Sequence, residues 1–353
     1  LAYEGRRNDA VKEAFQLVEL RDALFKQATQ IDKKDWPMDH LLWNLAYIQQ
    51  LQEETVGEEM DKAVWQQLSQ YDFLSQEQVK RDFTLNYLVN SYRAKESCEE
   101  SFIGQCVIPE IDESLPINHK CSESLFIRAN QMTQEQLKTS CDKLIGQEED
   151  FHTKLATNKE PVANDFNESL RVIIFDNYSQ YNRYGQTTFN IQTNNGGMYI
   201  EGKPSKPGNQ ATFFSFEAFW KRPEFSVWNL NHEYVHYLDG RFSKYSGFGH
   251  FPSHLVWWSE GLAEYISKGD DNKRAFKLLI ENERKDWPSL ADIFGTTYAD
   301  GSKRVYQWSY MAIRFLYEHY PEQFRQLKTY LKTDYFDGYK GLLDELSEKH
   351  QQE

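Results

Sequence analysis

The stretch NLNHEYVHYLDGRF, residues 229–242, holds two histidines and a glutamate at a spacing that suits metal chemistry. His232 and His236 are four residues apart, so one helical turn places both imidazoles on the same face. Glu233 follows the first histidine and leans toward the open position of a metal held by the pair. The spacing His-Glu-x-x-His therefore predicts a zinc site with a general base. The alternative is a pair of histidines that are satisfied within a protein core.

A third ligand separates these two interpretations, and WWSEGLAEYIS at 257–267 supplies it. Glu260 and Glu264 are four residues apart, hence on one face of a second helix. We expect Glu260 to ligate zinc and Glu264 to accept a hydrogen bond from a ligating imidazole. A solvated face is the alternative, but bulky apolar neighbours indicate a buried helix, where unpaired carboxylates would be costly. These neighbours are Trp257, Trp258, Leu262 and Ile266.

These residue types predict hydrolysis of a peptide bond. Zinc lowers the pKa of its bound water toward about 7, and Glu233 takes the proton during attack on a carbonyl and passes it to the leaving amine. The oxyanion needs one more donor, which the tyrosines of KRVYQWSYMAIRFLYEHY can supply. We expect Tyr306 in this role, with Tyr310 as the second choice. Ordinary packing is the alternative for each tyrosine.

The stretch NNGGMYIEG also bears on function. Gly196 and Gly197 let a backbone approach closely, and an edge strand through Met198 and Tyr199 could add a peptide substrate as an extra strand. A two-glycine hairpin turn is the alternative. Glu201 at the end could bind a hard cation such as calcium or remain solvated, and spacing alone favours the solvated carboxylate.

The elements that position these residues follow an α+β order. A Thr-x-x-Gln capping box at 133–136 predicts the start of a long helix. HEYVH then falls on the first helix after a sheet, and only amphipathic helices follow from about residue 270. The predicted strands are 125–129, 169–176, 187–193, 196–202 and 211–216.

The first part of the chain has a different pattern of apolar and polar residues. To about residue 92 the apolar spacing is helical throughout, which predicts stacked helical hairpins and an all-α helical-repeat segment. Residues 93–120 are irregular and polar, and we interpret them as a disulfide-tied connector. Proximity favours the pairs Cys98–Cys106 and Cys121–Cys141, which would imply an oxidising compartment. Four free thiols are the alternative, and a zinc cluster lacks the Cys-x-x-Cys spacing.

Length and charge limit the class of protein. With 353 residues the chain can form two domains. A net charge of −14 argues against a nucleic-acid partner, which needs clustered Lys and Arg. No run of about 18 apolar residues occurs, so we expect a soluble protein with no membrane span. The start LAYEGRRNDA has no initiator methionine, so we expect a processed piece.

HEYVHYLDGRF, WWSEGLAEY and NNGGMYIEG together make the sequence resemble the bacterial collagenases, particularly the Vibrio-type branch. The resemblance covers the chain well from about residue 120 to its end. It implies a thermolysin-like, or gluzincin, catalytic domain with a mixed five-stranded sheet. It also divides the chain into a helical activator portion with connector (1–115), a peptidase subdomain (116–268) and a helical helper subdomain (269–353).

The resemblance also implies a function. The family suggests His232, His236 and Glu260 as zinc ligands, Glu233 as general base and acid, and a calcium site near Glu201. It suggests residues 196–199 as the strand that docks the substrate. We accordingly expect a secreted, extracellular and monomeric zinc metalloendopeptidase that cleaves collagen or gelatin. The remaining alternatives are a zinc exopeptidase and a non-catalytic helical binding module with a structural zinc.

Overall fold

The computed structural model divides the described chain into two compact units. It describes residues 5, 8–16, 18–28, 44–49, 51–52, 55–57, 59, 62, 110–189, 191–193 and 195–350. The first unit comprises Leu1–Ser114 and Ser179–Asn194, and the second comprises Leu115–Tyr178 and Asn195–Glu353.

Helices form the described part of the first unit. Helix α1 (Asp9–Phe15) begins at Asn8, whose side chain caps the nitrogen of Val11, and α2 (Val18–Ala28) follows it. Residues 44–49 are also helical and largely buried. The helical prediction is therefore confirmed for these residues, while Cys98 and Cys106 lie outside the described part of the chain.

The second unit contains a mixed five-stranded sheet, as predicted, and its strand order is β1-β2-β3-β5-β4. The three inner strands are parallel, and the two edge strands run antiparallel to their neighbours. Helix α8 (Gln134–Leu155) connects β2 to its parallel neighbour β3, and it begins with the predicted capping box of Thr133 and Gln136. The strands are β1 (Ile117–Lys120), β2 (Leu125–Ala129), β3 (Leu170–Phe175), β4 (Met198–Ile200) and β5 (Ala211–Phe216).

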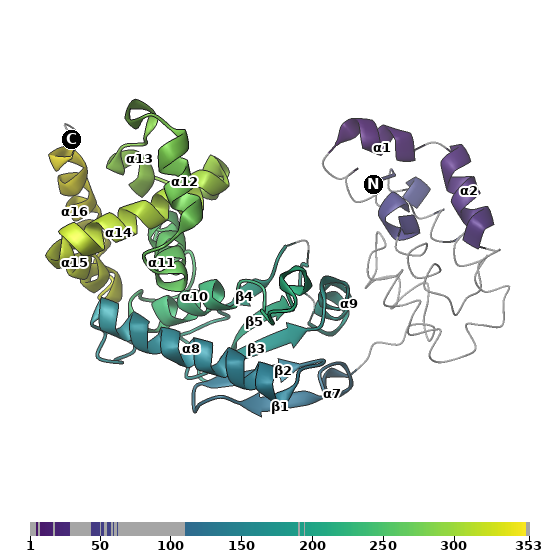
Figure 1. Ribbon diagram of the computed structural model, residues 1–353, viewed down its shortest axis with the longest axis horizontal. Helices are drawn as coiled ribbons and strands as arrows, with labels where there is room; N and C mark the ends of the chain where they lie inside the picture. Colours follow the sequence, from purple (N-terminus) through teal and green to yellow (C-terminus); the bar gives the residue numbers. More distant parts are fainter. Residues whose placement is uncertain are drawn as a thin grey trace. The chain divides into compact units, whose positions relative to one another are not determined.

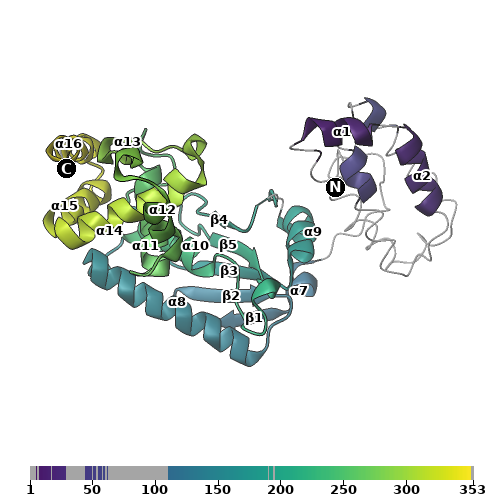
Figure 2. The same cartoon turned by 45° about the horizontal axis from the view of Figure 1, so that its top comes forward.

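One face of the sheet carries the main core. Alternate residues of the inner strands, such as Ile127, Val172 and Phe213, are fully buried and belong to the same apolar cluster as α8 and α10 (Leu230–Phe242). Figures 1 and 2 show α8 running beside the strands and the later helices gathered at one end of the sheet, with the C terminus among them. The later helices are α11 (Val256–Lys268), α12 (Lys273–Glu281), α13 (Leu290–Phe294), α14 (Ser309–His319), α15 (Pro321–Lys332) and α16 (Phe336–Lys349).

Two sequence-based assignments are wrong. The described residues of 187–193 do not form a strand, because α9 (Tyr178–Phe189) continues to Phe189 and residues 191–193 have no regular secondary structure. The loop is held by Thr193, whose hydroxyl donates to Asn182 of that helix at 2.6 Å. Within the predicted irregular connector 93–120, the described end forms α7 (Ile111–Ser114) and strand β1 instead. The sheet therefore gains β1 and loses the 187–193 strand.

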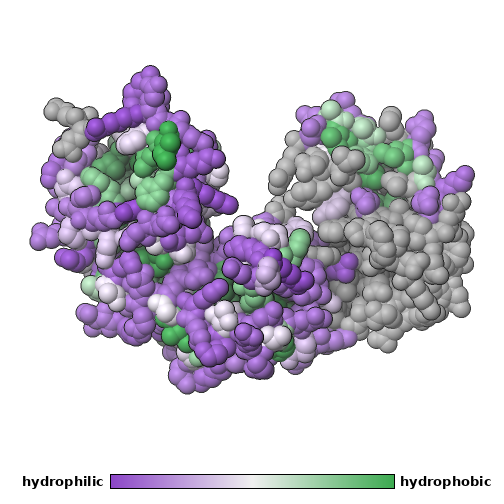
Figure 3. Space-filling view, in the orientation of Figure 1, coloured by the Kyte–Doolittle hydropathy of each residue, from purple (hydrophilic) through white to green (hydrophobic). Residues whose placement is uncertain are grey.

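The surface of the second unit is mainly hydrophilic on the face drawn in Figure 3, with paler and apolar residues over β4 and β5. No helix in the described ranges is both long and apolar enough to cross a lipid bilayer.

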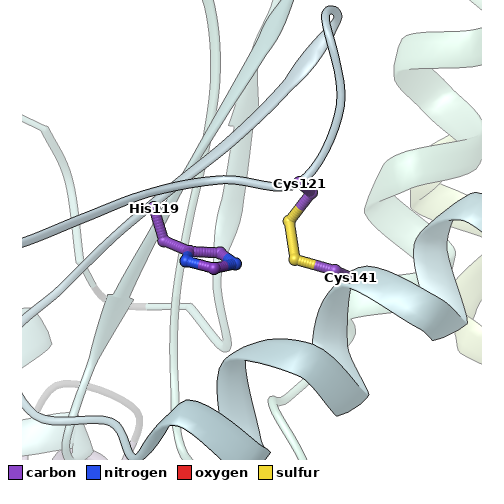
Figure 4. Close-up of side chains that lie close together, drawn as sticks. All are labelled: His119, Cys121 and Cys141. Carbon is purple, nitrogen blue, oxygen red and sulfur yellow. A yellow bond between two sulfur atoms is a disulfide. The ribbon is translucent and has the colours of Figure 1, made fainter.

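The predicted disulfide Cys121–Cys141 is present. It joins the end of β1 to α8, and His119 points toward it from the same strand (Figure 4). The pair closes a loop across a sequence separation of 20 residues, which includes β2 and the start of α8. The disulfide therefore ties the edge of the sheet to the helix that covers it.

Candidate active site

Helix α10 carries the two histidines on its cleft side. It begins after Asn229, which has a left-handed backbone (φ 54°), a conformation that asparagine tolerates better than most residues. His232 is 7% exposed, and the helix is buried along most of its length. The imidazoles of His232 and His236 are edge-to-face with ring centroids 4.9 Å apart. One turn of α10 therefore presents both rings to the same place.

Helix α11 brings the carboxylates. Glu260 Oε2 lies 3.1 Å from Nε2 of His232 and 3.7 Å from Nε2 of His236. The close packing of α11 depends on Gly261, where a Cβ atom would lie 2.5 Å from the carbonyl oxygen of Ser309 in α14. The glycine next to Glu260 therefore lets α14 approach the helix that carries this carboxylate.

The donor atoms of His232, His236 and Glu260 all lie within 4.8 Å of one another. Two imidazole nitrogens and one carboxylate oxygen are a donor set that zinc prefers, with the fourth position left for water or substrate. Among the described residues, one other group of this kind exists, made of His119, Cys121 and Cys141. Its two sulfur atoms are bonded to each other, so neither is a thiolate ligand. The His-His-Glu group is the better fit to a zinc ion.

Charge and burial set the protonation of this group. Burial disfavours the imidazolium of His232, but hydrogen bonds to Glu260 and Glu264 outweigh it and raise its pKa to about 10. Burial lowers the pKa of His236 to about 4, so this ring is neutral. Burial also opposes ionisation of Glu260, yet the neighbouring imidazoles and Tyr298 lower its pKa to about 2. The ionised Glu260 and the neutral His236 are therefore already in the forms that bind a metal, whereas His232 must release the proton at Nε2 when a metal binds.

Glu233 stands apart from the other carboxylates. Burial raises its pKa to about 7, although the charge of His232 opposes this shift. It lines the same cleft as His232, His236 and Glu260, which has a volume of about 1240 Å³. A carboxylate with this pKa can both accept and return a proton near neutral pH.

Glu264 lies behind His232. Its Oε1 is 3.2 Å from Nδ1 of His232, and its Oε2 accepts a hydrogen bond of 3.1 Å from Asn272. Its pKa is lowered, because hydrogen bonds from His232 and Asn272 overcome its burial. An ionised carboxylate can only accept, so Nδ1 of His232 is the donor and Nε2 is the atom that faces the metal position. The sequence predicted this contact for Glu264.

The two tyrosines occupy different places. Tyr306 lies on a π-helical turn (Lys303–Trp308) and lines the cleft, with its ring centroid 5.9 Å from that of His232. In the described part of the chain its hydroxyl has no hydrogen-bond partner. Tyr310 is fully buried, and its hydroxyl donates to the carbonyl of Gly269 at 2.8 Å. The structure therefore brings Tyr306 and not Tyr310 to the cleft.

The predicted docking strand is β4, an edge strand of the sheet. Tyr199, Ile200 and Glu201 line the cleft, whereas Gly196, Gly197 and Met198 do not. The carboxylate of Glu201 is 9% exposed and accepts a hydrogen bond of 2.6 Å from the backbone nitrogen of Phe248. Burial raises its pKa, and the nearby Lys244 partly opposes this. The solvated carboxylate that spacing favoured is therefore wrong, because Glu201 is buried, and its calcium role stays a prediction.

Two residues of the site were not predicted. Tyr298 donates from its hydroxyl to Oε1 of Glu260 at 2.7 Å, and Asn272 orients Glu264. Tyr298 lies on a short 3₁₀ turn (Tyr298–Asp300) after α13, with no periodic relation to HEYVH. Asn272 could have been found as the helix cap of α12 in GDDNKR, although that signal does not indicate a contact with Glu264.

Comparison with known proteins places this fold and site in a class of peptidases. The family model described as collagenase, peptidase family M9, matches residues 53–353. The chain therefore belongs to the M9 collagenase family.

Individual relatives agree with this family. The chain is 40% identical over 237 residues to a microbial collagenase of Vibrio alginolyticus and 34% identical over 238 residues to one of Vibrio vulnificus. Each match covers 67% of this chain and 29% of the relative. The chain is also 26% identical over 235 residues to a collagenase of Bacillus cereus, and this match covers 64% of this chain and 24% of that protein. The chain thus spans less than a third of the length of these relatives.

Proposed function

We propose that the second unit is the catalytic part of a zinc metalloendopeptidase that hydrolyses peptide bonds of collagen or gelatin. The observation that carries this proposal is the convergence of His232, His236 and Glu260 in a cleft that Glu233 also lines. The substrate class rests on the names of the relatives, which are collagenases.

The three ligands would hold zinc, which when bound lowers the pKa of water to about 7 and polarises a carbonyl. The carboxylate of Glu233 accepts the proton of the attacking water and returns it to the leaving amine, as its pKa of about 7 allows. The free hydroxyl of Tyr306 donates to the oxygen on which negative charge develops. Glu264 holds Nδ1 of His232 and so fixes the direction of Nε2.

The substrate backbone pairs with the free edge of β4, whose residues Tyr199 and Ile200 line the cleft. The proposal includes a thermolysin-like arrangement for residues 116–268, a helper role for 269–353 and an activator role for the helical residues 1–115. It also includes a monomeric state and secretion; the Cys121–Cys141 disulfide supports secretion, because such bonds persist in oxidising compartments. The proposal also includes a structural calcium ion that the carboxylate of Glu201 binds.

The test uses a gelatin-derived peptide that is acetylated at its amino end and amidated at its carboxyl end. Zinc-loaded protein should cleave it internally, a chelator should stop cleavage, and added zinc should restore it. Glu233→Ala should keep the metal and the fold and lose at least a thousandfold in rate, because Glu233 acts in both proton transfers. Cleavage that requires a free terminus would contradict an endopeptidase, and full activity of Glu233→Ala would indicate a structural zinc.

A further inference from the structure

A second group of metal-binding side chains lies between β1 and α8, away from the cleft. It consists of His119, Cys121 and Cys141, and we call it the sulfur site. Its donor atoms, one imidazole nitrogen and two sulfur atoms, all lie within 4.8 Å of one another. None of the three residues lines the cleft that contains the proposed zinc ligands. The sulfur site is therefore separate from the proposed peptidase site.

The period of a β-strand brings the first two ligands together. Successive side chains of a strand point to opposite faces, so His119 and Cys121, two residues apart, share one face. The burial of β1 follows this alternation, since His119 is partly buried and both Asn118 and Lys120 are exposed. Cys121 directly follows β1, and its backbone nitrogen donates to the carbonyl of Leu125 at 2.9 Å. His-x-Cys at the end of this strand therefore places two donors side by side, as His-x-x-x-His does on a helix.

Helix α8 brings the third ligand. Cys141 lies four residues after Leu137 and three before Leu144, and all three are buried in the core that α8 shares with the sheet. Figure 4 shows the ring of His119 directed at the sulfur atoms that join the end of β1 to α8. Cys141 is 6% exposed, whereas His119 and Cys121 are partly exposed. An ion from solution can therefore reach the sulfur site from the side of β1.

The imidazole of His119 is not engaged elsewhere. Within the described ranges it has no hydrogen-bond or ion-pair partner. Its neighbour across the β1–β2 pair is Ile127, which is apolar and fully buried and offers the ring no polar contact. The ring nitrogens are therefore available to a metal. One imidazole and two thiolates are ligands that zinc prefers, and they leave the fourth position for water.

The distances suit a tetrahedral ion once the two sulfur atoms are separate thiolates. With Zn–S of about 2.3 Å and Zn–N of about 2.0–2.1 Å, the donors of a tetrahedral site are about 3.5–3.8 Å apart. The three donor atoms already lie within 4.8 Å, and the Cα atoms of Cys121 and Cys141 are 5.3 Å apart. Rotation of the cysteine side chains between staggered positions can supply the remaining adjustment. The backbones of β1 and α8 need not move.

We propose that the sulfur site binds Zn²⁺ when Cys121 and Cys141 are reduced, with His119 as the third ligand and water as the fourth. Only a thiolate is a metal ligand, so the disulfide and the metal exclude each other. A dithiol reductant supplies two electrons and two protons and becomes a disulfide itself, and zinc then displaces the two thiol protons. In the reverse direction a small-molecule disulfide takes two electrons from the thiolates and two protons from solvent. It becomes two thiols, the Cys121–Cys141 bond forms and zinc is released.

The bound ion joins the same two elements as the disulfide, because β1 and its end supply two ligands and α8 supplies one. Thiols persist in a reducing compartment, where zinc would hold the edge of the sheet against α8. In an oxidising compartment the disulfide takes over this role. The proposal goes beyond the peptidase function and does not depend on it, since no residue is shared between the two sites.

The test uses the full chain with Cys98→Ser and Cys106→Ser, so that Cys121 and Cys141 are the only cysteines left of four. The protein is reduced with a dithiol, which is then removed under argon, and Co²⁺ is added as a spectroscopic probe. A thiolate-to-cobalt charge-transfer band reports the sulfur site alone, because the proposed catalytic ligands contain no sulfur. We expect one Co²⁺ per chain to give this band, Zn²⁺ to displace it, and no band while the disulfide is intact.

Two variants of β1 show whether the imidazole takes part. His119→Ala should weaken Co²⁺ binding, followed by the charge-transfer band, by at least about 100-fold, since removal of a ligand should cost no less than removal of a residue that orients one. Asn118→Ala is the matched control, because Asn118 is exposed on the opposite face of the same strand, and it should leave the affinity unchanged.

Crystals of the protein with all four cysteines make the test independent of the serine substitutions. After reduction and a zinc soak, anomalous data should show a peak between His119, Cys121 and Cys141, and the same soak without reduction should show none there. Absence of both band and peak in the reduced protein would overturn the proposal, and so would equal affinity of His119→Ala and the unaltered site. Loss of peptide cleavage with this site intact would count against the proposed function alone.

Discussion

Glu264 and His232 are joined by a contact of 3.2 Å between Oε1 and Nδ1, across two different helices. The contact orients the ring so that its other nitrogen faces Glu260. Loss of a carboxylate that orients a metal-binding histidine typically weakens metal affinity by about 10- to 100-fold.

We therefore expect Glu264→Ala to bind zinc about 10- to 100-fold more weakly, as measured by competition with a chromogenic chelator. Glu264→Gln keeps an oxygen acceptor without the charge, so its affinity should fall between those of the alanine variant and the unaltered protein. Equal affinity in all three proteins would show that the contact does not support the site.

Tyr306 and Tyr310 provide a matched pair, because the Tyr306 hydroxyl has no partner among the described residues and the Tyr310 hydroxyl is bonded to Gly269. Tyr306→Phe should lower kcat by about a hundredfold with little change in KM, since an oxyanion donor acts mainly in the transition state. Tyr310→Phe should leave kcat unchanged and reduce the free energy of unfolding by about 1 kcal/mol, because a buried acceptor loses its donor. The reverse pattern in steady-state kinetics would assign the donor role to Tyr310.

The disulfide Cys121–Cys141 should contribute to stability through the loop that it closes. A loop of this length corresponds to about 3 kcal/mol in the chain-entropy account. We expect the double variant Cys121→Ser, Cys141→Ser to lose about that much in urea unfolding, with zinc content retained. An unchanged midpoint would mean that the packing of α8 on the sheet suffices without the covalent bond.

A pH dependence of stability is expected from Glu148. Burial opposes its ionisation, but the imidazole of His152, 3.6 Å away, and a hydrogen bond from Tyr234 outweigh this and hold its pKa below the ordinary value of 4.5. A carboxyl whose pKa is lowered by folding stabilises the protein above its unfolded pKa, and this stabilisation is lost as the pH falls through its folded pKa.

The melting temperature of Glu148→Gln should therefore lie below that of the unaltered protein at pH 6, and the two should converge as the pH falls through the lowered pKa of Glu148. Glu149→Gln is the control, because the Glu149 side chain is 63% exposed and its loss should matter little at either pH. A constant difference between pH 6 and pH 3 would contradict the assignment of this effect to Glu148.

The sequence predicted those parts of the fold that local rules determine. The capping box at Thr133 and the strand at 125–129 follow from short-range patterns, and both are present. Residues 187–193 alternate like a strand, yet packing of α9 and the Asn182–Thr193 bond determine their conformation. Strand β1, INHK, is too short and polar to be recognised, and its pairing with β2 makes it a strand.

The same distinction between local patterns and long-range packing applies to the site. Helical spacing was enough to predict the site, because His232 and His236 lie on one face of their helix and Glu260 and Glu264 lie on one face of theirs. Tyr298 reaches Glu260 only through the packing of a distant turn, and no spacing in the sequence records that contact. The positions of Trp220 and Trp228 in the cleft likewise depend on how the 217–227 loop folds back on itself.

The central claim is that one zinc ion is held by the two α10 histidines and by Glu260 of α11. The most direct measurement is a crystal structure of the zinc-loaded protein with anomalous data at the zinc edge. We predict a single strong peak about 2.0–2.2 Å from Nε2 of His232, Nε2 of His236 and a carboxylate oxygen of Glu260. A zinc peak elsewhere, or one that leaves Glu260 unligated and turned away, would contradict the account.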